Sequence, residues 1–519
     1  MSESTRLAVS LGRSEPPLAE QIAAAAHAGA QLVELRVDLI EDLAQVEEVL
    51  RAARRLPLLV TLRCAAEGGA WRGTERERIT LLTALADLEP DFLDLEFKSL
   101  RDAPALAALG AVRRRNRPRL IVSWHDTIGC PPDPREIARL QRAAAPAAIT
   151  KTVCAARDAR DALRMLRVLR DGAPAGGRIA LAMGAAGLAS RVLARKFGAF
   201  LTFASPMPDT QTAPGQPTID ELRRVYRWDE ITPNSSVFGV VGWPVEHSLS
   251  PLVHNAAMRD AGIDGVYLPL PVLPEKASFD AFMKLAESES ALDLRGLSVT
   301  IPHKMHALTW LDERRFPVSD DAQRCGAVNT LIRTKQGWRG ENTDVSGFLT
   351  GLSTLVDAPA EAFRESSAAV LGAGGVAAAV VAGLRKIGCD VTVYNRTRER
   401  GAALAGRFGC GCAPWADRQN AGHDIVVNCT SVGMWPAVDA SPLDPFSFKA
   451  ECIVCDTVYR PARTKLLRDA EACGCRTLGG VEMFIAQAGE QFSLWHARPA
   501  PLAVMRAAIP PDNSDAPAR

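Results

Sequence analysis

A single unit recurs along the first 205 residues of the chain: a short apolar run, then a longer stretch rich in Ala, Leu and Arg at helical spacing. Such a run is typical of a buried strand and the stretch after it of a helix. The eight apolar runs begin at Leu7, Leu32, Leu56, Asp91, Arg119, Ala147, Arg178 and Phe200. Eight units in slightly more than 200 residues favour a closed (β/α)8 barrel over an open doubly wound sheet.

The repeat ends near Tyr226, and a different pattern begins after it. Residues 229–236 form a polar run with Pro233, Asn234 and two serines, which is typical of a connector because these residues favour turns. At 519 residues the chain is also too long for one hydrophobic core, and about two to four domains are expected. The barrel should therefore be followed by a separate second half.

The composition is that of a globular protein, with 47% hydrophobic and 23% charged residues. A formal net charge of +1 creates no overall field toward nucleic acid or an anionic membrane, so we expect neither as a partner. No apolar run reaches about 18 residues. The N-terminus leads directly into a strand without a signal sequence, so we expect a cytoplasmic protein.

Twelve cysteines in so long a chain do not suggest a disulfide framework. Cys452 and Cys455 are spaced as CxxC, but they lie inside an apolar run, and no second cysteine pair or histidine follows at zinc spacing. We interpret this run as a buried strand and expect no metal.

In a (β/α)8 barrel the chemistry lies at the carboxyl ends of the strands and in the loops that follow them. Polar side chains are frequent at these positions. They are Glu34, Arg36, Asp38, Arg63, Glu67, Glu96, His125, Lys151, Arg191, Thr212 and Gln216, with Met183 beside them. Because the carboxyl ends meet at one mouth of the barrel, we expect these side chains to share one site.

Lys151 is the side chain that most constrains the chemistry of this site. When burial and nearby cations lower the pKa of a lysine amine, its free electron pair can attack a ketone. His125 could then move protons near neutral pH. Arg36, Arg63 and Arg191 could bind a carboxylate and also lower the pKa of the lysine.

The alternative for Lys151 is a structural ion pair, which a lysine in a strand more often forms. Glu34, Glu67 or Glu96 could supply the carboxylate. The combination of Lys151 with a histidine and three arginines favours a catalytic role.

The first half resembles the type I 3-dehydroquinate dehydratases over almost all of residues 7–225. The likeness is carried by ELRVD from Glu34, TLR and EGG from Thr61 to Gly69, SWHDT from Ser123, TKTV from Thr150, AMG from Ala182, SR at 190–191 and APGQ from Ala213. It implies that Lys151 forms a Schiff base with the substrate ketone, that His125 transfers protons, and that Glu67 orients and charges the imidazole. It also implies substrate contacts from Glu34, Arg36, Arg63, Arg191, Thr212 and Gln216. Thr212 stands where the family commonly has serine, so the hydroxyl is retained.

Strand-like runs of the second half also end in polar loops. The run at 236–242 leads to Ser250–Pro251, which is a helix start signal, and later runs deliver Lys304, Asn329 and Asp344. Each residue alone is compatible with turn chemistry, because Asn, Asp and Ser favour turns and caps. Their grouping on one domain indicates a second site.

Residues 368–384 have the pattern of a strand, a glycine turn and a helix. Gly372, Gly374 and Ala377 fit G-x-G-x-x-G/A, in which small residues let a pyrophosphate approach the helix N-terminus. A second strand follows at the proper distance and completes a βαβ unit. It ends in Asn-Arg-Thr at 395–397 instead of the acidic residue of NAD enzymes, so the pattern predicts NADP.

The second half resembles the shikimate dehydrogenases from about residue 236 to 500. The likeness is carried by HSLSP, VTIPHK, GAVNT, NTD, GAGG, NRT, NCTSVGM, DTVYRPxxT and GGVEMFIxQ. It implies that Lys304 and Asp344 form the catalytic pair at the hydroxyl that becomes a ketone. It implies substrate contacts from Ser248, Ser250, Thr300, Asn329, Tyr459 and Gln487. It implies cofactor contacts from Gly372, Ala373, Gly374, Gly375, Asn395, Arg396, Thr397, Thr430 and Gly480.

One position departs from this family: Trp243 precedes Pro244 where members more often carry a small polar or basic residue, which concerns the shape of that loop. Quinate dehydrogenases resemble the same family but tend to alter the second serine of SxS or the threonine of VTIPHK. Both are present here as Ser250 and Thr300, which favours shikimate over quinate.

Together the two resemblances imply a bifunctional shikimate-pathway enzyme that dehydrates 3-dehydroquinate and reduces 3-dehydroshikimate with NADPH. The expected domains are a dehydratase barrel over 1–228, a linker over 229–235, a substrate-binding domain over 236–345 completed by a helix over 480–500, a Rossmann-type NADP domain over 346–479, and a flexible tail over 501–519. Two alternatives stay open: the reductase half acts mainly on quinate, or one half is a non-catalytic pseudo-enzyme.

Overall fold

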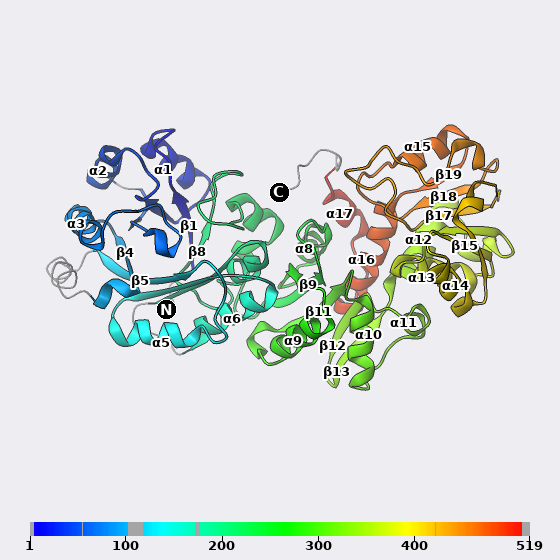
Figure 1. The fold of residues 1–519 in the computed structure, drawn as a ribbon, viewed down its shortest axis with the longest axis horizontal. Coiled ribbons are helices and arrows are strands. Elements are labelled where there is room, and N and C mark those ends of the chain that lie inside the picture. The colour runs from blue at the N-terminus through cyan, green and yellow to red at the C-terminus, as the bar shows by residue number, and fades with distance from the viewer. Residues whose placement is uncertain (1–4, 54, 102–117, 172–176, 421, 511–519) are drawn as a thin grey trace.

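The computed structural model describes residues 5–53, 55–101, 118–171, 177–420 and 422–510. Within these residues the strands form three sheets of eight, five and six strands. The sheets follow one another along the molecule in chain order, and the smallest sheet lies between the other two (Figure 1). The protein is therefore an α/β protein throughout.

The first sheet is the predicted barrel. Its strands are β1 (Arg6–Leu11), β2 (Leu32–Arg36), β3 (Leu58–Thr61), β4 (Phe92–Glu96), β5 (Arg119–Asp126), β6 (Ile149–Ala155), β7 (Arg178–Met183) and β8 (Leu201–Ala204). Parallel ladders run in order from β7 to β1 and then to β8. The Phe200 N–H donates to the Arg178 carbonyl at 2.6 Å, which joins the two ends of the sheet. The eightfold repeat in the sequence is confirmed.

Helices α1 (Leu18–His27), α2 (Leu43–Arg51), α3 (Glu75–Ala86), α5 (Arg135–Ala144), α6 (Ala159–Arg170) and α7 (Leu188–Val192) surround the barrel. One apolar residue from each strand fills the lower interior: Ala8, Leu32, Leu59, Phe92, Ile121, Ile149, Ile179 and Leu201. Because this layer closes the amino-terminal end, polar side chains from the same strands gather at the carboxyl end.

The second sheet contains β9 (Ser236–Gly242), β10 (Gly265–Pro271), β11 (Leu294–Val299), β12 (Thr330–Thr334) and β13 (Gly337–Glu341), in the order β10-β9-β11-β12-β13. The first three strands are parallel, and β12 and β13 are antiparallel to their neighbours. Its helices are α8 (Ser250–Asp260), α9 (Lys276–Glu287), α10 (Lys304–Glu313) and α11 (Asp320–Cys325). Helix α16 (Gly480–His496) returns to this sheet, where Trp495 Nε1 donates to the Leu331 carbonyl at 3.1 Å.

The third sheet contains β14 (Ser367–Leu371), β15 (Asp390–Asn395), β16 (Gly411–Pro414), β17 (Ile425–Asn428), β18 (Ile453–Asp456) and β19 (Arg476–Leu478). The order β16-β15-β14-β17-β18-β19 is fully parallel and is that of a Rossmann fold, with the reversal of direction between β14 and β17. Helices α12 (Thr343–Val356), α13 (Gly375–Lys386), α14 (Arg398–Phe408) and α15 (Lys465–Ala472) accompany it. A ligand is expected at the reversal.

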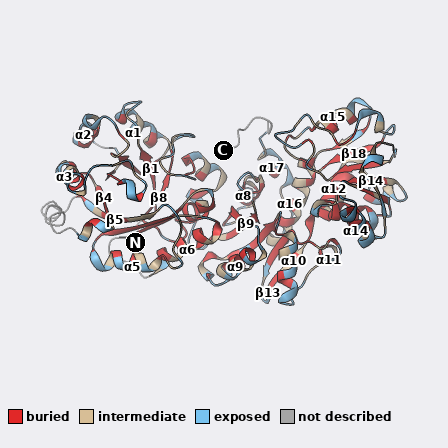
Figure 2. Cartoon of the chain, in the orientation of Figure 1, coloured by how far each residue is buried: buried red, intermediate tan, exposed pale blue. Residues whose placement is uncertain are grey.

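The connector between the halves is packed onto its neighbours. Trp228 is fully buried in a short 3-10 turn, and Lys196 Nζ donates to the carbonyls of Pro233 and Ser235 at 3.0 and 2.7 Å. Buried residues of the barrel and of the second sheet belong to one continuous apolar cluster. Figure 2 shows buried residues in both α6 and β9, which lie on either side of the junction. The polar run thus joins two parts that share a core.

Charged contacts also cross this junction. Arg167 and Arg170 on α6 pair with Glu289 beyond α9, and Arg259 on α8 pairs with Glu230 at 2.8 Å. Arg227 donates to the carbonyls of Ile263 and Gly265, at the start of β10. The barrel and the substrate-binding sheet therefore have a defined orientation.

The expectation of a flexible tail from residue 501 differs from the structure. Residues Leu502–Ala507 form helix α17, which packs against α8 and α16 and buries Met505 completely. Met505 and the half-buried Val504 give this segment apolar surface to bury, which the tail expectation overlooked. The rest of the expected tail, residues 511–519, lies outside the described residues.

Candidate active sites

A cavity of about 350 Å³ opens at the carboxyl end of the barrel. The barrel residues predicted to bind or convert a substrate all line it. They are Glu34, Arg36, Arg63, Glu67, His125, Lys151, Arg191, Thr212 and Gln216. Since these residues come from β2, β5 and β6, from α7 and from the loops after β3 and β8, only closure of the barrel brings them together.

Lys151 lies between two carboxylates. Its Nζ is 3.3 Å from Glu34 Oε1 and 3.2 Å from Asp94 Oδ2, and it lies 4.7 Å from the centre of the Phe203 ring. Carboxylates are thus its closest charged partners among the described contacts, while Arg36, Arg63 and Arg191 line the same cavity. An ion pair with Glu34 had been left open, and the structure contains it.

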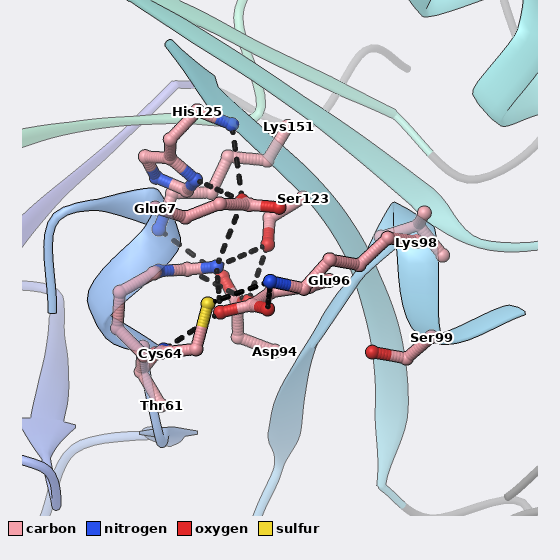
Figure 3. A network of polar contacts seen from close by, with 12 residues as sticks. Thr61, Cys64, Glu67, Asp94, Glu96, Lys98, Ser99, Ser123, His125 and Lys151 are labelled. Atoms are coloured by element: carbon pink, nitrogen blue, oxygen red, sulfur yellow. Dashed lines mark hydrogen bonds and ion pairs between the residues drawn. The ribbon is translucent and has the colours of Figure 1, made fainter. Parts of the chain in front are cut away.

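His125 is held by Glu67 within the same cluster of polar side chains as Lys151 (Figure 3). Glu67 Oε2 is 3.2 Å from His125 Nδ1 and accepts the His125 backbone N–H at 3.1 Å. Burial, followed by the charges of Arg63 and Lys151, keeps the pKa of His125 well below its ordinary value. Burial and the nearby Glu96 raise the pKa of Glu67 to about 7. The imidazole is therefore neutral near pH 7 and able to accept a proton.

The three arginines of the cavity differ in their partners. Arg36 is bound through two hydrogen bonds to Asp38, at 2.7 and 3.0 Å. Arg63 lies 2.8 Å from Asp94 and is further surrounded by Glu67 and Glu96. Each of these two guanidinium groups is already neutralised by carboxylates of the barrel.

Arg191 has no carboxylate partner among the described residues. Its exposed fraction is 2%, its Nη1 reaches only the Phe203 carbonyl at 3.5 Å, and its Nε is without a hydrogen bond. Burial lowers the pKa of Arg191 to about 10. A buried guanidinium without a counter-charge is costly, so this group is poised to bind an anion.

The loop after β8 covers the cavity. The Thr212 N–H donates to Gln216 Oε1 at 3.1 Å, and the Gly184 N–H donates to the Pro214 carbonyl at 3.0 Å. Gly215 has a φ of +67°, and a Cβ there would lie 2.2 Å from the Gly184 carbonyl carbon, so only glycine fits. The Thr212 hydroxyl lies 3.4 Å from the same Gln216 oxygen, so threonine fits the position of the family's serine.

In the second half, Lys304 and Asp344 form a close pair. Lys304 opens α10 and Asp344 lies in the first turn of α12, and their Nζ and Oδ2 atoms are 2.5 Å apart. Asn329 Nδ2 donates to the other oxygen of Asp344 at 2.9 Å, and Asn329 Oδ1 accepts the Thr343 N–H at 2.8 Å. The orientation of the carboxylate is therefore fixed from both sides.

Gln487 reaches this pair from α16. Its Oε1 lies 3.5 Å from the Thr343 hydroxyl. A Cβ at Gly347 would lie 2.9 Å from the Gln487 nitrogen, so glycine lets α12 and α16 approach each other there. Tyr459, after β18, stacks on Phe484 of α16 with ring centres 5.6 Å apart.

Ser248, Ser250 and Thr300 lie at the carboxyl ends of two neighbouring parallel strands. The Ser250 N–H donates to Ser248 Oγ at 3.2 Å, and Thr300 packs against Gly242 at the end of β9. This places the two serines on the same sheet edge as Lys304, which follows β11.

The glycine turn after β14 has the features of a phosphate cradle. Gly372 has a φ of +108°, and a Cβ there would lie 3.0 Å from the Cys429 carbonyl oxygen, so the turn favours glycine. Gly374 is the N-cap of α13, no side chain caps the helix, and a Cβ at Gly374 would meet nothing within 4 Å. The free N–H groups of this helix end fit a pyrophosphate.

The other predicted cofactor residues lie after the neighbouring strands β15 and β17 and at the start of α16. Arg396 and Thr397 are exposed after β15, beside Asn395. The Thr430 hydroxyl donates to Asn428 Oδ1 at 2.7 Å after the adjacent strand β17. Gly480 begins α16, and a Cβ there would lie 2.5 Å from the Val458 carbonyl oxygen. Glycine therefore lets the start of α16 pack closely on the loop after β18.

Sequence reasoning missed four buried polar residues at these sites. Asp94 contacts Lys151 directly, and its signal was the alternation of Asp94 with Glu96 in an otherwise apolar strand. In the second half, the Tyr267 hydroxyl donates to Ser298 Oγ at 2.7 Å, which donates to Gln491 Oε1 at 2.6 Å. Gln491 is four residues after Gln487, a spacing that places both on one helix face.

Membrane-spanning helices and metal-binding groups are both absent from the residues that the structure describes. No helix among the described residues is both long and apolar enough to cross a membrane. Within the same residues, no three His, Cys, Asp or Glu side chains are grouped so that they could hold a metal ion.

A barrel with a buried lysine beside a neutral histidine, followed by a Lys–Asp pair next to a Rossmann sheet, defines an enzyme with two reaction centres: a lyase and a dinucleotide-dependent oxidoreductase. Family models match accordingly. They are type I 3-dehydroquinase over residues 7–233, the shikimate dehydrogenase substrate binding domain over 240–331, shikimate / quinate 5-dehydrogenase over 354–433, and the shikimate 5'-dehydrogenase C-terminal domain over 480–509.

The chain is 35% identical over 492 residues to the bifunctional 3-dehydroquinate dehydratase/shikimate dehydrogenase, chloroplastic, of Arabidopsis thaliana, covering 91% of this chain and 79% of that protein. It is 43% identical over 278 residues to the shikimate dehydrogenase (NADP(+)) of Oleidesulfovibrio alaskensis, covering 53% and 94%. Shikimate 5-dehydrogenase of Thermus thermophilus, solved with NADP(H) and shikimate, is 36% identical, with a TM-score of 0.47 over 53% of this chain and 98% of that one. The chain belongs to the family of bifunctional 3-dehydroquinate dehydratase/shikimate dehydrogenases, which are enzymes of the shikimate pathway.

Proposed function

We propose that the barrel dehydrates 3-dehydroquinate through an imine on Lys151, and that the second half reduces the resulting 3-dehydroshikimate to shikimate with NADPH. The observation that carries the first step is the position of Lys151 and His125 in one cavity with the unpaired Arg191. The close pair of Lys304 and Asp344 carries the second.

At the barrel, Arg191 binds the substrate carboxylate, because it is the cavity arginine that lacks a counter-charge among the described residues. Lys151 attacks the ketone carbon as a neutral amine. The proton that its ammonium gave up, together with one amine proton, then leaves with the carbonyl oxygen as water, which yields a protonated imine. This imine withdraws electrons from the neighbouring carbon and acidifies its proton. His125 takes that proton and returns one to the departing hydroxyl, while Glu67 holds the imidazole through Nδ1.

Borohydride tests the imine. When it is added together with 3-dehydroquinate, we expect irreversible inactivation and a mass increase on the peptide that carries Lys151, because the hydride reduces the C=N bond to a stable amine. Enzyme that is incubated with borohydride alone is the control. Inactivation without a label on Lys151 would rule out the imine mechanism.

Arg191→Met is expected to raise the KM for 3-dehydroquinate about 10- to 100-fold, the size of a lost charge-assisted hydrogen bond. The melting temperature should rise in the same variant, because an unpaired buried charge is removed. Arg36→Met is the matched contrast: it should lower the melting temperature, since Asp38 loses its partner. A melting temperature that falls in Arg191→Met would contradict the unpaired state of Arg191.

At the second site, Ser248, Ser250 and Thr300 bind the carboxylate end of the substrate, and Asn329 and Gln487 bind the ring. The Lys304 ammonium stabilises the negative oxygen that develops on the ketone and supplies its proton, and Asp344 keeps the ammonium oriented. Tyr459 adds a contact near the carboxylate.

NADP(H) would be held by the glycine turn at 372–375, by Asn395, Arg396 and Thr397 at the adenosine end, and by Thr430 and Gly480 on the opposite side. When bound, it supplies the hydride. The open, uncapped N-terminus of α13 fits its pyrophosphate, and the exposed Arg396 fits a 2'-phosphate. The NADP(+) dehydrogenases among the relatives support this choice.

We keep shikimate as the substrate in preference to quinate because Ser250 and Thr300 are both present. We also propose the domain division given by the sequence, with the barrel over 1–228, the connector over 229–235, the substrate-binding part over 236–345 and 480–500, and the cofactor-binding part over 346–479. A cytoplasmic location is part of the same proposal, and its support is that all twelve cysteines are free thiols.

A further inference from the structure

Asp94 is a buried carboxylate of the barrel to which the mechanism above gives no role. It projects from β4, and its side chain is 1% exposed. Its Oδ2 is 3.2 Å from Lys151 Nζ, and its Oδ1 is 2.8 Å from Arg63 Nη2 and accepts from Ser123 Oγ at 2.6 Å (Figure 3). The carboxylate is thus fixed by three donors, one of which is the nitrogen that reacts.

The two carboxylates next to Lys151 occupy different places. Glu34 lines the cavity, where a substrate can reach it, and it also accepts from Ser10 and Thr61. Asp94 does not line the cavity. It contacts the lysine nitrogen from within the barrel, so a bound substrate leaves this contact in place.

This nitrogen must be neutral at one step of the reaction and positively charged at the next. The amine must lose a proton to attack the ketone, but the imine that forms must carry a positive charge to acidify the neighbouring carbon. A cation in a buried site requires a counter-charge. The carboxylate of Asp94 is in hydrogen-bonding distance of this atom and is kept ionised, because Arg63 and Lys151 outweigh the effect of burial and lower the pKa of Asp94.

We propose that Asp94 is the counter-ion of the Lys151 nitrogen, as an ammonium in the free enzyme and as an iminium in the intermediate. It acts as a positioning and charge-balancing residue and makes no contact with the substrate. This inference rests on the imine chemistry proposed above.

Other charges face the same nitrogen and must be included in its electrostatics. They are Glu34 and Arg36 from β2, Arg63 after β3, His125 from β5 and Arg191 from α7. Arg63 is balanced by Asp94, Glu67 and Glu96, and Arg36 by Asp38. Loss of Asp94 therefore removes one of the two carboxylates in contact with the nitrogen and leaves Glu34 as the other.

The test uses cyanoborohydride, which reduces protonated imines much faster than neutral ones. The rate at which Lys151 is labelled with saturating 3-dehydroquinate is measured by mass spectrometry from about pH 5 to about pH 11, a range that extends past the ordinary pKa of a lysine amine. We expect a bell-shaped profile, because the free amine is needed at low pH and the protonated imine at high pH. In Asp94→Asn the whole bell should move to lower pH by about one unit or more, since a close opposite charge stabilises both cations by that amount.

A purely structural role for Asp94 would lower the height of the bell and leave its position unchanged, and this result would overturn the proposal. Glu96→Gln is the matched control, because Glu96 lies on the same strand and near Arg63 but does not contact Lys151. An equal shift in Glu96→Gln would show that the effect belongs to the general negative charge and would also overturn the proposal. Asp94→Glu should keep the bell within about half a unit of the wild type, because the charge is retained.

Folding of each variant is checked by circular dichroism and by the reductase activity of the same chain. If Asp94→Asn does not fold because Arg63 loses its nearest carboxylate, Arg63→Met is compared with Arg63→Met/Asp94→Asn, in which both buried charges are absent. The double variant must have its bell at lower pH than the single one. Absence of any label in the wild-type enzyme would refute the imine itself, whereas labelling with an unchanged bell refutes only the role of Asp94.

Discussion

Lys151→Ala is expected to lower the dehydratase kcat about 10³-fold or more, because no other group at this position can form the imine. The reductase activity of the same chain should stay within about twofold of the wild type, since separate sites contribute independently. The two rates are measured as the appearance of enone absorbance with 3-dehydroquinate and as NADPH consumption with 3-dehydroshikimate.

Lys151→Arg is the control for the charge of the lysine. It keeps a cation between Glu34 and Asp94 but has no nucleophilic amine, so its dehydratase activity should be lost to the same extent. Its melting temperature should exceed that of Lys151→Ala, which removes the cation between two buried carboxylates. Loss of both enzyme activities in Lys151→Ala would contradict the assignment of two independent sites.

Lys304→Ala is expected to lower the reductase kcat by about 10²- to 10⁴-fold, the usual contribution of general acid–base catalysis, with the dehydratase unaffected. Asp344→Asn should cause a loss of similar order, because it leaves the ammonium without the carboxylate that orients it. Lys276→Ala is the matched control, since Lys276 pairs with Asp280 and Glu313 on the surface of the same part of the chain. A rise in KM with an unchanged kcat would show that Lys304 only binds the substrate.

Much of the fold could be predicted because its patterns are local. The eight apolar runs of the first half correspond to β1–β8, and the glycine turn at 372–375 joins β14 to α13. Strand and helix periodicity are visible within about a dozen residues, so each element can be recognised from its own sequence. The helix in the expected tail was harder to predict, because α17 has only six residues and is stabilised by packing on α8 and α16.

The candidate residues were also accessible, because those in (β/α)8 barrels and Rossmann sheets follow the carboxyl ends of strands. The contacts of each residue were harder to predict from the sequence. Asp94 looked like part of a buried strand, and its contact with Lys151 depends on how β4, β5 and β6 lie beside one another. Arg36, Arg63 and Arg191 looked equivalent in the sequence.

The sequence by itself determined the barrel, the Rossmann sheet, the family and the barrel residues that line the cavity, because strand period and motif spacing are properties of the chain. Only the tertiary structure decided that carboxylates and not arginines flank Lys151, that Arg191 is the cavity arginine without a counter-charge among the described residues, and that the two halves share a core. These features depend on distances between side chains from different strands. Such distances are set by the closure of the barrel and by packing across the junction, which no single segment encodes.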